Sequence, residues 1–319
     1  MKNFGMVGMN PGNGHPFSFT ACFNGFDPEA LETRCSFPII RKYLNEHHGN
    51  REFIPDARIT HIWTHDPKLS ADVAAVSKIP NIASSLEELA NEVDGIIFAR
   101  DDIWNHDEMA LPLFKSGKPV YMDKLMCATP EELARWSKTI PADYPLMTAS
   151  SFRFAPLVSQ AAQMIKDNPP LTIRGMSPCV WLRYAPHLLD ALFAICGREV
   201  ETVQNSGSDG KDIVTLTYRD GLQVVLEVFD GVGLPLGLTL HFPAPQGPVE
   251  VPYTDSDLSS YFFSIVNMMK EFTGMAETGI TPTPRDQMFH MNRVVLAGIA
   301  SREQGGIKIK MDSFYPESK

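Results

Sequence analysis

The chain of 319 residues lacks the patterns of disulfide-bonded, zinc-binding and membrane-spanning proteins. Its five cysteines are odd in number and form no C-x-x-C pair, which predicts a reducing, cytoplasmic setting without a disulfide framework or a metal site. No apolar run approaches the roughly 18 residues of a membrane span. The N-terminus runs straight into an apolar strand and lacks the long apolar region of a signal peptide.

Positive charge is also scarce. The chain has 28 Lys and Arg against 38 Asp and Glu, a formal net charge of −10, and contains no basic block. This excludes the electrostatic footprint of a nucleic-acid-binding protein. The sequence also has no internal repeat and no low-complexity segment. Its 44% apolar and 21% charged residues are typical of a soluble globular protein, and its length predicts two domains.

The first half of the chain alternates short apolar runs with helical stretches. The runs predicted to be strands are Phe4–Met9, Arg58–Thr64, Val93–Ala99, Val120–Met122 and Pro145–Ala149. Helical segments lie between them, and two start with capping boxes, at Ser85 and at Thr129. This alternation predicts an α/β domain over residues 1–150, built on a doubly wound parallel sheet of the Rossmann type.

Lys124 follows the predicted strand Val120–Met122 and precedes the capped helix that starts after Thr129. Ligands of open α/β sheets bind beyond the carboxyl ends of the strands. Lys124 is therefore predicted to meet a cofactor and a substrate together. The alternative is a surface lysine paired with Asp123.

Two further strand ends carry nucleotide-binding signals. After the first strand, Gly8, Gly12 and Gly14 form a glycine-rich turn that can approach a pyrophosphate, although Asn10 and Asn13 stand at two fingerprint glycine positions. An ordinary Gly/Asn turn is the alternative. After the second strand, Asp66 is placed to accept from a ribose 2′-OH and to repel a 2′-phosphate, which favours NAD(H) over NADP(H). The alternative is a turn aspartate before proline.

The order of these motifs resembles the Gfo/Idh/MocA oxidoreductases, which include glucose–fructose oxidoreductase and inositol dehydrogenase. Asp123-Lys124-Leu125 is similar to their Glu-Lys-Pro turn, and Arg153-Phe154-Ala155-Pro156 looks like their R-F-x-P segment. The stretch from Ala185 to Asp190, followed by Cys196-Gly197, resembles their G-x-H-x-x-D helix. The resemblance spans nearly the whole chain, and its specificity lies in the order and spacing of the motifs.

The resemblance implies a second, α+β domain over residues 151–319, with an open, largely antiparallel sheet. Strands expected at Asp212–Tyr218 and Leu222–Phe229, joined by a hairpin turn, agree with it. The resemblance also implies that this sheet joins subunits into a homodimer or homotetramer.

The activity implied is NAD(P)-dependent hydride transfer at a carbinol or carbonyl carbon of a sugar, polyol or related small molecule, without a metal. His187 is the implied general acid/base, although a lone histidine on an apolar helix is often structural. Lys124 would bind the same substrate oxygen. The implied cofactor contacts are Gly8, Asn10, Gly12, Gly14, Asp66, Asp101, His106 and Lys124, and the implied substrate contacts are Arg153, Arg183 and Asp190.

The chain departs from the family pattern at three places: the glycine turn, Leu125 in place of proline, and Arg183 in place of an acid four residues before His187. These departures leave two alternatives to hydride transfer: a catalytically silent ligand- or nucleotide-binding sensor, and an NAD-assisted glycosidase. Arg183 itself suggests a substrate with an acidic group, because its guanidinium fork suits a carboxylate or phosphate. Pairing of Arg183 with a protein carboxylate is the alternative.

Overall fold

The computed structural model describes residues 1–314 except 50, 52, 198 and 254–257, and the chain divides into two compact units. Unit 1 comprises Met1–Cys127, Lys138–Ala149 and Phe262–Arg285, and unit 2 comprises Ala128–Ser137, Ser150–Tyr261 and Asp286–Lys319. The sequence analysis placed a single boundary after residue 150. The units are instead assembled from several segments each, and a stretch near the C-terminus joins the N-terminal unit.

Unit 1 is built on a six-stranded sheet in the order β3-β2-β1-β4-β5-β6, with all neighbouring strands parallel. The strands are β1 (Lys2–Val7), β2 (Ala57–Trp63), β3 (Asn81–Ile82), β4 (Gly95–Phe98), β5 (Val120–Met122) and β6 (Leu146–Thr148). Each predicted strand of the first half is present, and β3 adds a short edge strand. The predicted Rossmann-type parallel sheet is therefore confirmed.

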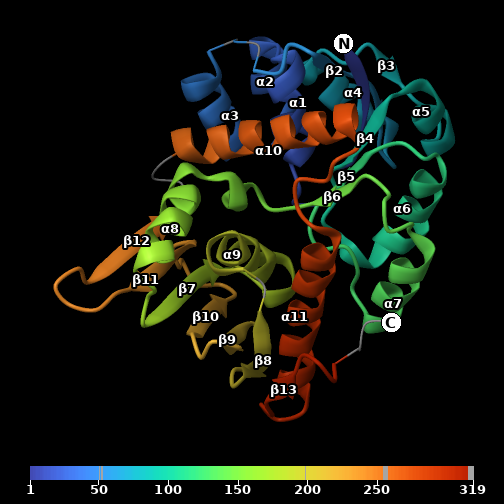
Figure 1. Ribbon diagram of the computed structural model, residues 1–319. Coiled ribbons are helices and arrows are strands. Elements are labelled where there is room, and N and C mark those ends of the chain that lie inside the picture. The colour runs from blue at the N-terminus through green and yellow to red at the C-terminus, as the bar shows by residue number, and fades with distance from the viewer. Residues whose placement is uncertain (50, 52, 198, 254–257, 315–319) are drawn as a thin grey trace. The chain divides into compact units, whose positions relative to one another are not determined.

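Helices connect these strands and cover both faces of the sheet (Figure 1). They are α1 (His15–Asn24), α2 (Pro28–Arg34), α3 (Pro38–Tyr43) with the π-helical turn Leu44–His48, α4 (Pro67–Ser77), α5 (Leu86–Glu92), α6 (His106–Lys115) and α10 (Leu258–Thr278, from Phe262 on). Both capping boxes are confirmed: Ser85 Oγ accepts from Glu88 N at 3.1 Å, and Thr129 Oγ1 accepts from Glu132 N at 3.2 Å.

The pleat of β1 explains how helices pack on both faces, because successive side chains of a strand point to opposite sides. Phe4 packs against Phe23 of α1 and Phe272 of α10, with ring centroids 5.8 and 4.9 Å apart. Gly5 faces the other way, where a Cβ would lie 2.4 Å from the Leu89 side chain of α5. Glycine at this position therefore lets α5 approach the sheet closely.

Unit 2 contains a seven-stranded sheet in the order β12-β11-β7-β10-β9-β8-β13. The strands are β7 (Thr172–Pro178), β8 (Val200–Asn205), β9 (Lys211–Tyr218), β10 (Gln223–Phe229), β11 (Gly237–His241), β12 (Pro248–Pro252) and β13 (Ile309–Lys310). Only β7 and β10 pair in parallel. The open, largely antiparallel sheet is confirmed, including the predicted hairpin of β9 and β10.

Unit 2 includes the helices α7 (Pro130–Thr139, up to Ser137), α8 (Pro156–Asp167), α9 (Trp181–Cys196) and α11 (Arg285–Glu303, from Asp286 on). In Figure 1, α9 lies across the sheet. It is fixed to α11 by Trp181, whose Nε1 donates to the Val295 carbonyl at 2.9 Å. Along β9 and β10, buried residues alternate with half-buried or exposed ones, so one face of the sheet forms the core and the other is partly open.

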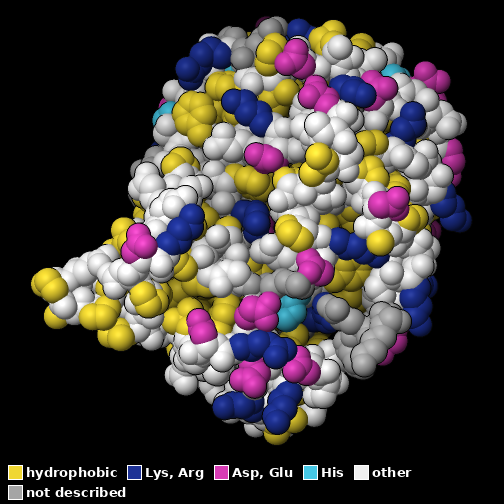
Figure 2. All heavy atoms as spheres, viewed as in Figure 1, with side chains coloured by type: hydrophobic (Ala, Val, Ile, Leu, Met, Phe, Trp, Pro, Cys, Tyr) yellow, Lys and Arg dark blue, Asp and Glu magenta, His cyan; other side chains and the backbone are white. Residues whose placement is uncertain are grey.

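On the face drawn in Figure 2, acidic and basic side chains are interspersed. None of the helices in the described part of the chain combines the length and the hydropathy that a membrane crossing requires.

Candidate active site

The glycine turn between β1 and α1 holds its glycines for packing and backbone reasons. A Cβ on Gly8 would lie 2.7 Å from Pro16 Cγ and 2.9 Å from the Ala99 carbonyl oxygen, and one on Gly14 would lie 2.5 Å from Ile40 Cδ1. Gly12 has φ +82°, which side chains rarely adopt. No side chain caps α1, and its first turn contains no acidic residue.

Two predicted cofactor residues, Asn10 and Asp101, bind one another. Asn10 Nδ2 donates to Asp101 Oδ1 at 2.7 Å, and the Asp101 backbone N–H returns a bond to Asn10 Oδ1 at 3.1 Å. Both residues are buried. The pair joins the loop after β1 to the loop after β4. Asn10, which stands at a position where the fingerprint has a glycine, is therefore held against the loop after β4.

Arg100 is a site residue that sequence reasoning missed. Its guanidinium makes a two-bond ion pair with Asp102 and donates to the Met9 carbonyl at 2.8 Å. Its Nη1 also lies 3.0 Å from His65 Nδ1. Burial acts to raise the pKa of Asp102, but the hydrogen bonds from Arg100 and Asn105 hold it below its ordinary value. Arg100 thus ties together the loops that follow β1, β2 and β4.

His106, another predicted cofactor residue, is buried between two backbone carbonyls. Its Nδ1 lies 3.2 Å from the Met126 oxygen and its Nε2 lies 3.1 Å from the Arg100 oxygen. Burial lowers the pKa of His106. The ring links the loops after β4 and β5, and its predicted contact with a cofactor stays a prediction.

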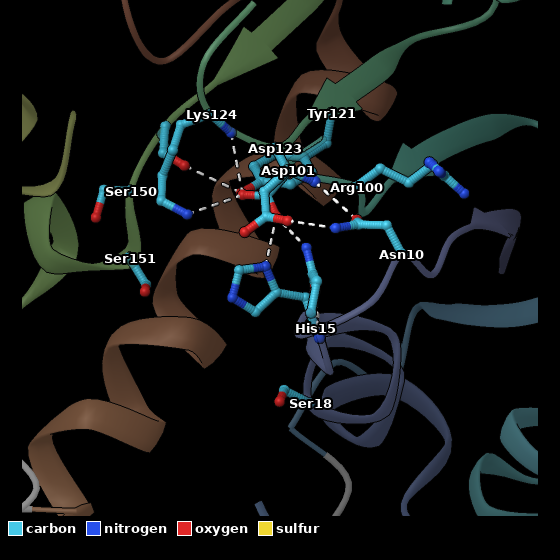
Figure 3. Close-up of polar contacts among 12 residues, drawn as sticks. Asn10, His15, Ser18, Arg100, Asp101, Tyr121, Asp123, Lys124, Ser150 and Ser151 are labelled. Atoms are coloured by element: carbon cyan, nitrogen blue, oxygen red, sulfur yellow. Dashed lines mark hydrogen bonds and ion pairs between the residues drawn. The ribbon is translucent and has the colours of Figure 1, made fainter. Parts of the chain in front are cut away.

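Asp123 is the centre of a polar cluster at the end of β5 (Figure 3). Its Oδ1 accepts from the Lys124 backbone N–H at 3.0 Å and lies 3.5 Å from Lys124 Nζ. Its Oδ2 makes a close contact with His15 Nδ1 and accepts from Asn13 Nδ2 at 3.4 Å. Burial acts to raise the pKa of Asp123, but the charges of His15 and Lys124 lower it.

Lys124 pairs with Asp123, as the alternative hypothesis predicts. It is not a surface residue, however, because only 4% of it is exposed. Leu125, which replaces the proline of the family motif, is fully buried, and the peptide bond between Lys124 and Leu125 is cis. His15 was missed by sequence reasoning. The available signal was a histidine at the first position of the helix that follows the glycine turn.

Asp66 lies just beyond β2 and is exposed. It is the N-cap of α4, and its Oδ1 accepts from the Lys68 backbone N–H at 2.8 Å. The turn aspartate of the alternative hypothesis is thus present in the form of a helix cap. One carboxylate oxygen of Asp66 thus serves as the helix cap, and the contact of Asp66 with a ribose stays a prediction.

In unit 2, the candidate acid/base His187 is held by a network that begins at Ser150. Ser150 Oγ lies 2.7 Å from His187 Nδ1, and the Ser150 backbone N–H donates to Asp190 Oδ2 at 2.7 Å. Arg153 Nη1 donates to Asp190 Oδ1 at 3.1 Å. Burial raises the pKa of Asp190, although Arg153 opposes this shift. The structure therefore brings His187, Asp190 and Arg153 into one network through Ser150, which sequence reasoning missed.

Arg183 lies in the first turn of α9, and its backbone N–H donates to the Val180 carbonyl at 3.2 Å. Since α9 includes both Arg183 and His187, four residues apart, the two side chains lie on one face of the helix. Arg183 is half-buried. The geometry leaves both hypotheses for this arginine open.

No protein family profile matches the chain, and no curated protein sequence does. Solved structures match over the full length. A scyllo-inositol dehydrogenase of Lactobacillus casei with bound NAD(H) and scyllo-inositol is 11% identical, with a TM-score of 0.72 over 98% of this chain and 100% of that one. An oxidoreductase of Agrobacterium radiobacter in complex with NAD+, L-tartaric acid and magnesium is 14% identical, with a TM-score of 0.73 over 98% and 99%.

A myo-inositol 2-dehydrogenase of Lactobacillus plantarum is 11% identical, with a TM-score of 0.72 over 97% of this chain and 99% of that one. At such identities the likeness concerns the fold, and it includes both units. The chain therefore has the complete two-unit fold of the inositol dehydrogenases and related oxidoreductases to which its motifs are similar.

Proposed function

We propose that the protein is an NAD-dependent oxidoreductase that transfers a hydride between a nicotinamide and a carbinol or carbonyl carbon of a sugar, polyol or related small molecule. The observation that carries this proposal is the match over 98% of the chain to a dehydrogenase and an oxidoreductase that were solved with a nicotinamide cofactor and a polyol or an acid. Conversion of such substrates requires the cofactor to supply the hydride chemistry, while the protein supplies orientation and electrostatics.

The residues of unit 1 fit a nicotinamide dinucleotide in two respects. The turn from Gly8 to Gly14 brings backbone close to an uncapped helix N-terminus, where a diphosphate binds favourably. Asp66 lies at the carboxyl end of β2, the position of a ribose ligand. Asn10 and Asp101 fit less simply, because their mutual bonds occupy the place of a fingerprint glycine.

We assign the proton chemistry to two side chains. Lys124, at the end of β5, donates to the substrate oxygen and offsets negative charge that develops there. His187, on α9, exchanges the proton of the substrate hydroxyl, as an imidazole does near neutral pH. All five cysteines are free thiols, which supports the proposal that the protein works in a reducing compartment such as the cytoplasm.

The test combines two measurements on the purified full-length protein. Native mass spectrometry should detect NAD(H) binding, and a panel of polyols, sugars and sugar acids should include one that reduces NAD+ to NADH. If a panel member bound tightly but no member of a broad panel turned over, the silent sensor would replace the oxidoreductase. Release of a sugar without net NADH would instead indicate an NAD-assisted glycosidase.

Cofactor preference rests on Asp66. Its carboxylate accepts from a ribose 2′-OH and repels a 2′-phosphate, so we expect NAD(H) to bind more tightly than NADP(H). Calorimetry on the wild type and on Asp66→Ser should show the difference shrinking in the variant, with Asp72→Ser, on the same helix, as the control. Tighter NADP(H) binding by the wild type would contradict the assignment.

Arg183 suggests that the substrate carries an acidic group, and the Agrobacterium radiobacter neighbour binds L-tartaric acid. We expect Arg183→Gln to weaken turnover of acidic sugars while sparing matched neutral ones, and Arg183→Lys to keep part of the activity on acids. Equal losses on acidic and neutral substrates would identify Arg183 as a structural residue.

We further propose that the partly open face of the unit 2 sheet joins subunits in a homodimer or homotetramer. Ile213 of β9 is 38% exposed on this face, and Thr215, Thr217 and Val225 are half-buried beside it. Light scattering should show that Ile213→Lys lowers the molecular mass in solution. The control Ile280→Lys changes an exposed isoleucine of unit 1 and should leave the mass unchanged.

A further inference from the structure

Ser150 contacts His187 at a nitrogen whose role can be derived from the surrounding hydrogen bonds. The Ser150 hydroxyl oxygen lies 2.7 Å from His187 Nδ1 and accepts from the Phe152 backbone N–H at 3.2 Å. Ser150 is 1% exposed. Its hydroxyl hydrogen therefore needs an acceptor in the protein, because an unsatisfied buried donor costs stability.

Among the residues that the structure describes, His187 Nδ1 is the acceptor at hydrogen-bond distance from this hydroxyl. The Phe152 backbone N–H acts as a donor in this contact and occupies one of the two lone pairs of the oxygen. Ser150 therefore donates its hydrogen to Nδ1. A neutral imidazole carries one proton, so its proton then resides on Nε2.

We infer that Ser150 is a positioning residue for His187, which fixes the ring orientation and assigns the proton of the neutral ring to Nε2. The catalytic consequence rests on the proposed oxidoreductase function. The proton on Nε2 makes this nitrogen a hydrogen-bond donor for the carbonyl oxygen of the oxidised substrate.

A serine also supports the reverse direction. When the ring holds a proton on Nδ1, the hydroxyl can rotate and accept from it, because an O–H group both donates and accepts. A carboxylate in this place would only accept, and would fix the proton on Nδ1. Ser150 thus favours the donor state of His187 without forbidding the state that takes a proton from an alcohol.

The same network explains why Ser150 stays in place. Its backbone N–H is bound by Asp190, which is fully enclosed and is itself held by Arg153 through a bond of 3.1 Å. We therefore assign Asp190 and Arg153 to the support of the Ser150 loop, in addition to the substrate contacts that the family resemblance implies.

The direct test is NMR of the full chain labelled with ¹⁵N-histidine, without cofactor or substrate. The ring resonances of His187 are assigned as those lost in His187→Gln. At neutral pH we expect Nε2 to be protonated, and Nδ1 to show the shift of an unprotonated nitrogen that accepts a hydrogen bond. A neutral ring protonated on Nδ1 in the wild type would overturn the proposal without any variant.

Two serine variants separate the bond from the fold. In Ser150→Ala, the Nδ1 resonance should move toward that of a nitrogen without a hydrogen bond, and Ser150→Thr should restore it. Ser151→Ala is the matched control, because its hydroxyl bonds to Tyr253 at 2.6 Å instead of to His187. An unchanged Nδ1 resonance in folded Ser150→Ala would also overturn the proposal.

If the panel yields a substrate, kinetics add a second readout. Loss of an orienting partner typically lowers activity ~10–100-fold, as for outer-shell partners of metal ligands. We expect this loss in kcat of Ser150→Ala, with KM nearly unchanged and activity recovered in Ser150→Thr. Because the NMR result requires no turnover, failure of the oxidoreductase proposal and failure of the Ser150 assignment remain distinguishable.

Discussion

Each unit buries one aspartate beside a candidate catalytic side chain, and the two aspartates behave oppositely. Asp123 precedes Lys124 in unit 1, and Asp190 holds the Ser150 loop next to His187 in unit 2. Their exposed fractions are 1% and 2%. The pKa of Asp123 is nevertheless lowered, whereas the pKa of Asp190 is raised.

The difference lies in the neighbouring cations, since burial disfavours the charged form of both carboxyls. Asp123 has two cationic neighbours, His15 and Lys124, and together they outweigh burial. For Asp190, the cation that lowers the pKa among the described residues is Arg153, and burial outweighs it. Burial alone therefore does not set the charge of an aspartate. The carboxylate of Asp123 is an ionic anchor in unit 1, whereas the carboxyl group of Asp190 acts mainly through hydrogen bonds in unit 2.

The largest expected effect is on turnover, and it concerns the candidate catalytic residues beside these two aspartates. Lys124→Met and His187→Ala should each lower kcat by roughly 10²–10⁴-fold, the usual contribution of a proton-transfer group. Cofactor affinity should be largely kept, and so should folding, because the buried Asp123 keeps its contact with His15 in Lys124→Met. NADH absorbance measures kcat, calorimetry measures cofactor affinity, and circular dichroism measures folding.

Lys115→Met and His241→Ala are suitable controls, since Lys115 is exposed on α6 and His241 lies on a strand of the unit 2 sheet. Full activity in either Lys124→Met or His187→Ala would remove that residue from the proposed mechanism and leave the other unit with the proton chemistry.

The second effect concerns Asp123 itself. Asp123→Asn leaves His15 and Lys124 facing an amide, and removing one partner of a buried ion pair costs about 3 kcal/mol. Because the folded pKa of Asp123 is lowered, its stabilisation is present above the ordinary pKa of 3.8 and is lost as the pH falls through the folded value.

Urea unfolding near neutral pH should therefore show a less stable variant, and the gap to the wild type should close in strong acid. Asp143→Asn, at an exposed site, is the control for loss of a negative charge. A gap that persisted unchanged in acid would mean that the carboxylate charge is not what stabilises unit 1.

These networks show where sequence reasoning ends. The strands of unit 1 were predictable because buried apolar runs alternate with capped helices, and such patterns are local. The attachment of residues 262–285 to unit 1 was not predictable. Apolar residues of α10 at helical spacing, among them Phe262, Ile265 and Met269, show that one face is buried but not what covers it.

The site divides in the same way. Lys124 and His187 were found through the order of motifs, but His15 and Ser150 belong to no motif that was recognised. Their partners are 108 and 37 residues away in sequence, so only the folded chain brings them together. The local sequence also gave no sign that Asp190 would be raised in pKa and Asp123 lowered, since both shifts depend on tertiary neighbours.

His48 sharpens the comparison, because it is buried without a carboxylate partner. Its Nε2 donates to the Ala21 carbonyl at 2.7 Å, and among the described residues its Nδ1 has no hydrogen-bond partner. Burial lowers the pKa of His48 below 6.5, so as the pH falls past that value the unfolded chain binds the proton first and the fold loses stability.

Below about pH 6.5, this group should therefore lower the unfolding free energy progressively as the pH falls. His48→Gln should reduce the slope of stability against pH, and His47→Gln, at the neighbouring position, should keep it. Identical slopes in the wild type and His48→Gln would mean that burial alone does not keep this histidine neutral.

The smallest effect is expected where burial is only partly compensated, at Asp190. Because its folded pKa is raised, the folded chain holds the proton longer than the unfolded chain, and stability falls as the pH rises from 3.8 through the folded value.

A neutral asparagine side chain at this position avoids that cost and still offers an oxygen to one of the two donors. The expected net loss in Asp190→Asn is about 1 kcal/mol, that of one hydrogen bond. Asp190→Ala should lose more, because the Ser150 N–H would lose its acceptor and Arg153 would be left with its 3.4 Å bond to the backbone carbonyl of residue 190. If urea unfolding showed Asp190→Asn to be as damaging as Asp123→Asn, Arg153 alone would be sufficient to make Asp190 an ionic anchor, and the two units would use their carboxylates alike.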